Sequence, residues 1–196
     1  MEIFYHGSSA LFREFCLSHA LEGDGKMKFG FGIYVTQSYR TAAHYASTGK
    51  GASAEDHYVY TVEVPESRED NHLWSNRPVH PAIVRRAETR LKELIPQEVV
   101  LRGKLFRKYI GNKMLGRKGT VRQLSGKADV ETEKAAARFL VAIGVEFLVW
   151  PCSQNKPDGE QNRAILDEEC IRVVRIERVE VKNGRLVTGM EKEVRL

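Results

Sequence analysis

The stretch Phe29–Ala46, FGFGIYVTQSYRTAAHYA, decides how this chain is expected to fold. It opens by alternating phenylalanine with glycine, and the apolar run Ile33–Thr36 that follows is typical of a short strand. Ser38 is a suitable N-cap for a helix over Ser38–Ala46. The glycines precede a strand and do not open a helix, so the string is not a dinucleotide-binding fingerprint. The stretch predicts a glycine-rich entry, a strand and a helix in succession.

Strands are predicted toward both ends of the chain, with helices between them. The apolar and β-branched runs predict strands at Glu2–His6, His57–Pro65, Val145–Pro151, Asn162–Asp167 and Ile171–Val181. Helical spacing of apolar residues predicts helices at Pro81–Leu94, Leu101–Ile110 and Asp129–Ile143. The chain has 196 residues and shows no repeat or long linker. We therefore expect one α+β domain over residues 1–196.

The composition excludes several classes of protein. Apolar residues make up 42% and charged residues 29%, which is typical of a globular protein. No run of about 18 apolar residues is present, so no membrane span is expected. The chain opens MEIFYHGSS, without a basic segment followed by an apolar core, so no signal peptide is expected. The three cysteines, Cys16, Cys152 and Cys170, form no C-x-x-C pair, which argues against a disulfide framework or a zinc site and favours the cytoplasm.

The positive charge is concentrated in one segment. The chain has 31 basic and 26 acidic residues, a net charge of +5, yet no acidic residue lies between Glu98 and Asp129. We interpret residues 99–128 as a basic helical insertion that either binds a polyanion or is simply a solvated face. The remainder of the chain carries −4, because the segment holds nine basic residues: Arg102, Lys104, Arg107, Lys108, Lys113, Arg117, Lys118, Arg122 and Lys127.

Three local patterns carry possible chemistry. The first is Tyr5–Ser9, where a histidine at a strand end is followed by Gly7, and its alternative role is structural. In the second, Gly30 and Gly32 permit a tight turn or close approach to a ligand, and Tyr34 with Tyr45 could stack on a flat ring or belong to the core. The third is Glu160–Asp167, a polar entry into a late strand, which is equally compatible with a hydrogen-bonded loop end.

Together and in this order, the motifs YHGSS, GFGIY with its following helix AHYA, and NRAILD resemble the diphtheria-toxin-like ADP-ribosyltransferases. The similarity covers nearly the whole chain and is greatest to the small phage polyvalent-protein and bacterial-toxin branch. The resemblance implies a split β-sheet core with flanking helices. It also implies that NAD is the substrate and that no metal is needed.

The resemblance also assigns roles residue by residue. His6 would hold the adenosine ribose of NAD, and the Gly7 backbone would pair with the nicotinamide carboxamide, to which Ser8 adds a hydroxyl. Tyr34 and Tyr45 would sandwich the nicotinamide ring. The predicted cofactor-binding residues are therefore His6, Gly7, Ser8, Gly32, Tyr34 and Tyr45.

The third motif departs from the family pattern. Five residues before Asp167 the family usually has a glutamate, whereas this chain has Asn162. An amide can bond the nicotinamide ribose but supplies no negative charge to a cationic transition state. Glu160 lies two residues earlier and could substitute, because alternate residues of a strand share a face. The predicted catalytic residues are thus His6, Tyr34 and either Asn162 or Glu160.

The resemblance implies a mono-ADP-ribosyltransferase, either a toxin or a phage-borne modifier. The acceptor is a macromolecule, with nucleic acid slightly favoured over protein because of the basic segment. Acceptor binding is assigned to Arg102, Lys104, Arg107, Lys108, Lys113, Arg117 and Lys118, and a neutralising antitoxin is a possible partner. The alternatives are a catalytically inactive module that binds NAD or ADP-ribose and, ranked lower, an enzyme that removes a 2′-phosphate from RNA.

Overall fold

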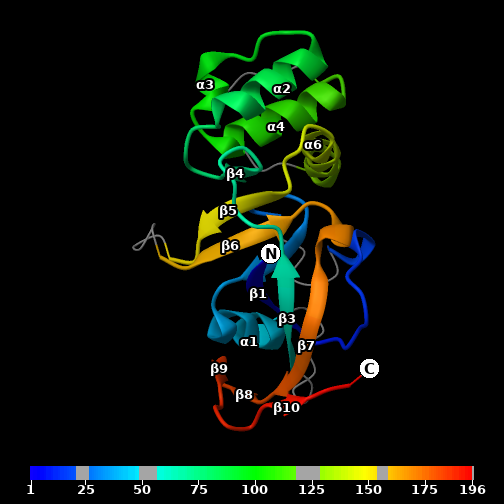
Figure 1. Ribbon diagram of the computed structural model, residues 1–196, viewed down its shortest axis with the longest axis vertical. Helices are drawn as coiled ribbons and strands as arrows, with labels where there is room; N and C mark the ends of the chain where they lie inside the picture. The colour runs from blue at the N-terminus through cyan, green and yellow to red at the C-terminus, as the bar shows by residue number, and fades with distance from the viewer. Residues whose placement is uncertain (21–26, 49–56, 118–128, 154–158, 196) are drawn as a thin grey trace.

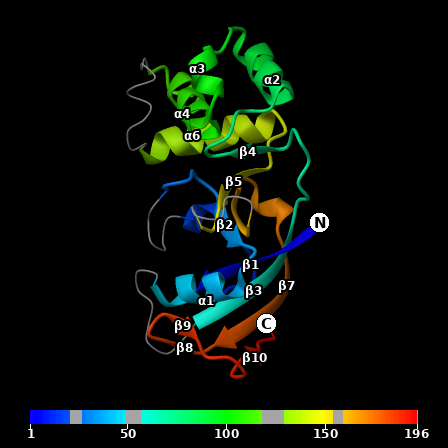
Figure 2. The ribbon, with the colours of Figure 1, turned by 90° about the vertical axis from the view of Figure 1, so that its left-hand side faces the viewer.

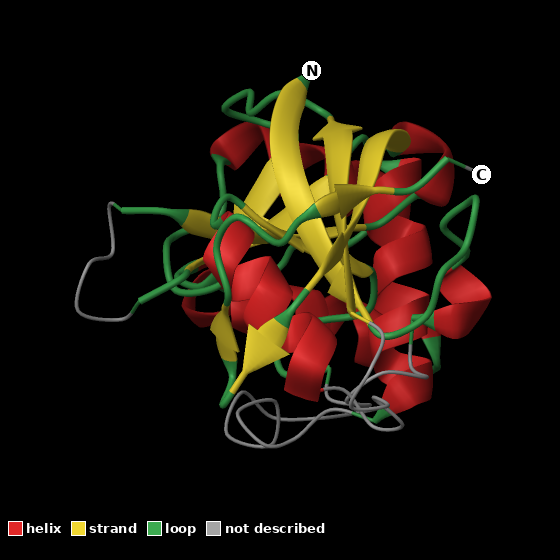
Figure 3. Cartoon of the chain, turned by 90° about the horizontal axis from the view of Figure 1, so that it is seen from below, coloured by secondary structure: helices red, strands yellow, loops and turns green. Residues whose placement is uncertain are grey.

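An eight-stranded sheet forms the body of the protein in the computed structural model, which describes residues 1–20, 27–48, 57–117, 129–153 and 159–195 (Figure 1). The strand order is β10-β7-β3-β1-β2-β6-β5-β4. All neighbours are antiparallel except β4 and β5, and the sheet is strongly twisted (Figure 3). The strands are β1 (Glu2–Ser8), β2 (Ile33–Thr36), β3 (His57–Val64), β4 (His72–Trp74), β5 (Phe147–Pro151), β6 (Gln161–Ile165), β7 (Arg172–Val179) and β10 (Lys192–Glu193).

The register decides which side chains share a face of the sheet. Tyr5 lies opposite Thr36, and Thr36 lies opposite Asn162, so these three side chains point to the same side. Tyr34 joins them, because it is two residues from Thr36 on β2. Helix α1 (Tyr39–Thr48) packs on this face against β1 and β3 (Figure 2).

A helical group lies at one end of the sheet, above β5 and β4 in Figure 1. It belongs to the connection between β4 and β5, because parallel neighbours require a crossover. The predicted basic insertion at about 99–128 lies within this larger group and extends into residues outside the described ranges. The helices are α2 (Pro81–Leu91), α3 (Gln97–Val100), α4 (Gly103–Met114) and α6 (Val130–Ala142), and they share one apolar core with β5 and β6.

The α+β class and the predicted long strands and helices are confirmed, with shifts at their ends. The Asp129 side chain caps α6 by accepting a hydrogen bond from the Thr132 N–H (2.8 Å). Helix α2 ends before the predicted Leu94, because Lys92 is left-handed with a φ of 57°. The sequence missed the three-residue β4 and the hairpin of β8 (Val181–Lys182) and β9 (Arg185–Leu186), which are too short to show a period. It also missed the 3-10 turns η1 (Leu17–His19) and η2 (Glu168–Cys170).

None of the helices in the described ranges has the length and apolar character needed to cross a membrane.

Candidate functional site

Strands β1 and β2 pair at one position and then separate. Tyr5 lies opposite Thr36, and no second pair joins the described residues of these two strands. Nevertheless β1 stays paired with β3 as far as Ser8, and β2 stays paired with β6 from Ile33 onward. The sheet is therefore split beside Gly7, within a body that is otherwise continuous.

The His6 imidazole bridges the two strands where the ladder stops. Its Nδ1 lies 2.7 Å from the Tyr34 carbonyl oxygen, which can only accept, so Nδ1 carries the proton. Burial lowers the pKa of His6 below its ordinary value of 6.5, against the opposing effect of this hydrogen bond. His6 is therefore neutral at pH 7, with Nε2 as an acceptor. Phe15 packs edge-on against the ring, with centroids 5.0 Å apart.

Gly7 has a structural reason of its own to be glycine. A Cβ at this position would lie 1.8 Å from the Ala42 carbonyl oxygen of α1. The close approach of α1 to β1 thus excludes any side chain here. Ser8, whose hydroxyl was predicted to contact a ligand, accepts a hydrogen bond from the Ala10 N–H (3.0 Å) and so supports the turn after β1.

The glycine-rich loop before β2 holds the Tyr34 side chain. Gly30 has a φ of 119°, and its carbonyl accepts a 2.8 Å hydrogen bond from the Tyr34 hydroxyl. The same hydroxyl accepts one from the Phe29 N–H (3.3 Å). Burial raises the pKa of Tyr34 to about 12, so the phenol stays protonated. The ring tilts against Trp150 at 4.9 Å, and Phe29 stacks on the same indole at 4.3 Å.

A buried ion pair anchors this loop to the helical group. Arg107 on α4 and Glu133 on α6 are 2% and 1% exposed and form two hydrogen bonds, from Nε to Oε2 (2.6 Å) and from Nη2 to Oε1 (3.1 Å). The remaining nitrogen, Nη1, donates to the Phe29 carbonyl oxygen (2.6 Å). A continuous set of contacts therefore runs from α6 through Arg107 and Phe29 to Tyr34.

Tyr45 lies on α1 and is 56% exposed. Its phenol is close enough to contribute to the raised pKa of Tyr34, although burial is the larger cause. The role of Tyr45 in holding a flat ring beside Tyr34 stays a prediction. Gly32, with a φ of 155°, allows β2 to approach β6, since a Cβ there would lie 2.7 Å from the Ile165 carbonyl oxygen.

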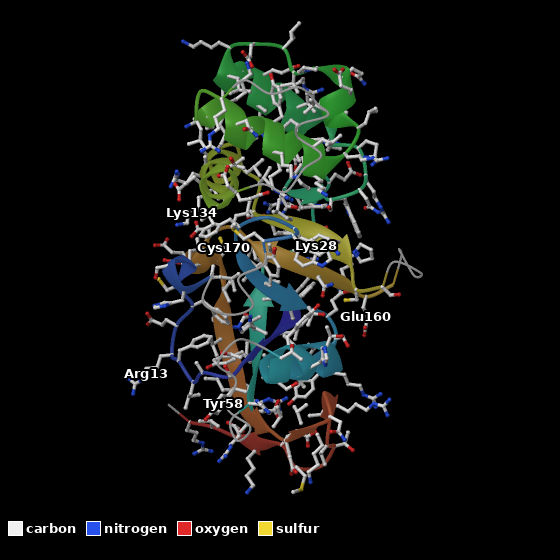
Figure 4. All side chains as sticks on the ribbon, turned by 180° about the vertical axis from the view of Figure 1, so that it is seen from behind. Arg13, Lys28, Tyr58, Lys134, Glu160 and Cys170 are labelled. Carbon is white, nitrogen blue, oxygen red and sulfur yellow. The ribbon has the colours of Figure 1, made fainter. Side chains whose placement is uncertain are left out.

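The third motif brings Asn162 to the shared face of the sheet. Asn162 is 6% exposed, pairs with Thr36 across the ladder, and accepts a hydrogen bond from the Cys152 thiol (3.2 Å). That thiol also lies 3.4 Å from the Thr36 hydroxyl, and burial raises its pKa, so it remains a thiol. Glu160 is exposed beside the end of the β5–β6 hairpin (Figure 4).

The basic segment is less available than the sequence predicted. Arg107 and Lys108 are buried, at 2% and 4% exposure, so the prediction that they bind an acceptor is wrong: their side chains pack inside the helical group. Lys113 pairs with Glu93 (2.8 Å), and Arg117 pairs with Asp129 (2.5 Å).

Two other predicted acceptor contacts remain accessible. Arg102 is exposed and Lys104 is half-buried, whereas Lys118 lies outside the described residues.

The structure therefore collects His6, Gly7, Tyr34 and Asn162 around the split between β1 and β2. Comparison with family models, with curated proteins and with solved structures gives no match to this chain. Within the described ranges, no group of three or more histidine, cysteine, aspartate or glutamate side chains could hold a metal ion. The sequence missed Trp150, Arg107 and Glu133 as supports of the site. The apolar run around Trp150 was the only local sign of its role. No neighbouring residues indicated that Arg107 and Glu133 form a buried pair.

Proposed function

We propose that the protein is a mono-ADP-ribosyltransferase that transfers ADP-ribose from NAD to a macromolecular acceptor, with nucleic acid favoured over protein. The observation that carries this proposal is the split of the sheet beside Gly7, with Tyr34 and Asn162 on one face and the His6 imidazole between the strands. The resemblance of the three motifs assigns these same positions to NAD. The proposal includes the split-sheet fold of that family.

The residues present suit the parts of NAD. The Tyr34 ring, fixed by its hydroxyl and by Trp150, offers an aromatic face for the nicotinamide, and Tyr45 offers a second. The Gly7 backbone borders the split and would meet the carboxamide. The neutral His6 ring has Nε2 as an acceptor for a ribose hydroxyl.

In the reaction, the bond between the nicotinamide nitrogen and the ribose C1′ breaks, and its electron pair leaves with nicotinamide. The acceptor's nucleophile bonds to C1′ and loses its proton. The site contributes by holding both partners in line and by excluding water. Asn162 would bond the nicotinamide ribose, while the nearby Glu160 carboxylate would supply the negative charge that an amide lacks. This division of roles fits transfer of a single ADP-ribose.

The proposal is tested by incubating the protein with NAD labelled in its adenylate part and with cell extract separated into protein, RNA and DNA. Transfer of label and release of nicotinamide are measured for the wild type and for His6→Asn and Tyr34→Ala. Tyr109→Phe is the control, because the Tyr109 hydroxyl bonds Glu93 far from the split. Both site variants should lose at least about tenfold in rate, and the control should not. Label transfer that survives both substitutions would refute the proposal.

An inactive module that binds NAD or ADP-ribose is the second candidate. It is favoured by one observation, that the Asn162 amide oxygen accepts the Cys152 thiol and so is already partnered. This candidate predicts NAD binding without nicotinamide release. Asn162→Glu and Glu160→Ala separate the two: the first should raise and the second lower the rate of an active enzyme, whereas neither would create a rate in an inactive module.

A further inference from the structure

A hollow of about 600 Å³ lies between α2 and the C-terminal end of α6, away from the split in the sheet. Its apolar lining is made of small and branched side chains, Ala82, Ala142 and Ile143. Its polar lining comes entirely from one face of α2. The residues of this face recur at spacings of three and four, which places them side by side on a helix: Arg85, Arg86, Thr89 and Arg90.

Two of the three guanidinium groups are held in place. Arg86 donates from Nη1 to the Asp70 carboxylate (2.6 Å) and from Nη2 to the Asp70 carbonyl (2.5 Å). Its Nε is buried and finds no acceptor among the described residues. Arg90 lies over the Phe139 ring at 5.9 Å. Arg85 is exposed. Asp70 offsets one of the three charges, so the hollow keeps a positive rim over an apolar floor.

The segment that contains α2 carries a small positive excess of its own, because residues 75–98 hold five basic and three acidic residues. Residues 75–146 contain sixteen basic and seven acidic residues, a net charge of +9, so the remainder of the chain carries −4. This excess equals the charge of residues 99–128, because the rest of the connection holds seven basic and seven acidic residues. Within 99–128, Arg107 and Lys108 are buried. Arg90 lies between Glu88 and Glu93 in the sequence, and only the fold brings it and Arg85 to one hollow with the end of α6.

We propose that this hollow binds single-stranded nucleic acid, with phosphates on the arginine rim and a base against the apolar floor. A guanidinium fork matches a phosphate in two hydrogen bonds, and arginines held in advance lose little freedom on binding. Arg85 and Arg90 are the two groups left for successive phosphates, because both Nη atoms of Arg86 already bond Asp70. This inference extends the proposed function. It rests on that function only for the claim that the bound nucleic acid is the acceptor of ADP-ribose. Binding itself requires no NAD.

The test measures binding without NAD. Fluorescence anisotropy follows a labelled single-stranded RNA of about twelve nucleotides, and DNA of the same sequence, over a salt titration. The variant is Arg85→Gln/Arg90→Gln, which leaves the Arg86–Asp70 contact intact. The matched control is Arg13→Gln/Arg185→Gln, which removes two exposed arginines from the sheet part of the chain. Polyglutamate serves as the competitor that represents an acidic protein surface.

The hollow variant should bind at least about tenfold more weakly, with a salt slope reduced by about two, and the control should change affinity less than about twofold. Absence of binding by the wild type, an equal loss in the control, or equal competition by polyglutamate would overturn the inference. Label transfer to protein without nucleic-acid binding would leave the enzymatic proposal standing alone. Nucleic-acid binding without nicotinamide release would remove the enzymatic proposal and retain the binding site.

Discussion

Removing the buried cation of Arg107 should destabilise the fold far more than removing an exposed one. In Arg107→Met, the Glu133 side chain stays buried at 1% exposure and loses both of its hydrogen bonds from the guanidinium. Breaking a buried pair in this way costs about 3–5 kcal/mol. The Phe29 carbonyl also loses its donor. Urea unfolding followed by tryptophan fluorescence measures the change, and Trp150 on β5, stacked on Phe29, reports on the contact between the strand and the loop.

Two further variants test whether the loss comes from the unpaired buried charge. Arg107→Met/Glu133→Leu removes both charges, so it should cost only about 1–3 kcal/mol, mainly from the unpaired Phe29 carbonyl. Lys113→Met breaks the pair with Glu93, whose side chains are 40% and 38% exposed, and should cost at most about 1 kcal/mol. A double variant less stable than Arg107→Met, or a single variant no worse than Lys113→Met, would refute this reasoning.

The same double variant separates support of Tyr34 from general stability. It should fold at room temperature but leave the Phe29–Gly30 loop without its anchor. If the loop positions Tyr34 for nicotinamide, the rate of nicotinamide release should fall at saturating NAD even where unfolding is negligible. An unchanged rate would show that Arg107 and Glu133 matter to the fold alone.

Three other predictions concern the split in the sheet. Tyr34→Phe keeps the ring but loses its hydroxyl bond to the loop, so it should cost about 1 kcal/mol in urea unfolding and retain NAD affinity. The pKa of His6 is lowered in the fold, so the stability it contributes is present above about pH 6.5 and is lost as the pH falls below that value. Between about pH 7.5 and 5.5, the urea midpoint should therefore fall more for the wild type than for His6→Asn. Equal falls would contradict this prediction. Gly7→Ala should cost about 3 kcal/mol or more because its Cβ would clash with the Ala42 carbonyl. The control is Gly144→Ala, which has open space around it and a φ of 80°, and it should cost about 1–2 kcal/mol from backbone strain. Equal melting temperatures for the two variants would contradict the clash.

The elements of the fold were largely predictable from local patterns. β3 is rich in β-branched and aromatic residues, and β5 is a continuous apolar run. α6 carries its own N-cap at Asp129, so neighbouring residues mark where this helix begins. β4 was not predictable, because three residues show no period and the strand exists only through its pairing with β5. The end of α2 also escaped, since the left-handed Lys92 is not marked by glycine.

The motif residues around the split were predictable only as separate patterns. Their common face follows from the register of β1, β2 and β6, which no local signal specifies. The roles of Arg107 and Glu133 are a further case, because the two residues are 26 positions apart and meet only when α4 packs on α6. The run of basic residues in 99–128 therefore predicted an exposed binding surface, whereas part of this run is buried in the helical group.

Local patterns in the chain establish the α+β class and most element positions, and they single out Tyr34, His6 and Asn162 as candidate site residues. The reason is that strand and helix periods and motif spacing are properties of neighbouring residues. The three-dimensional arrangement was needed to show that β1 and β2 separate at Gly7, that Arg107 is buried, and that the exposed arginines of α2 share a hollow with α6. These features depend on contacts between segments distant in the chain. Burial and charge pairing are set by such contacts and not by neighbouring residues.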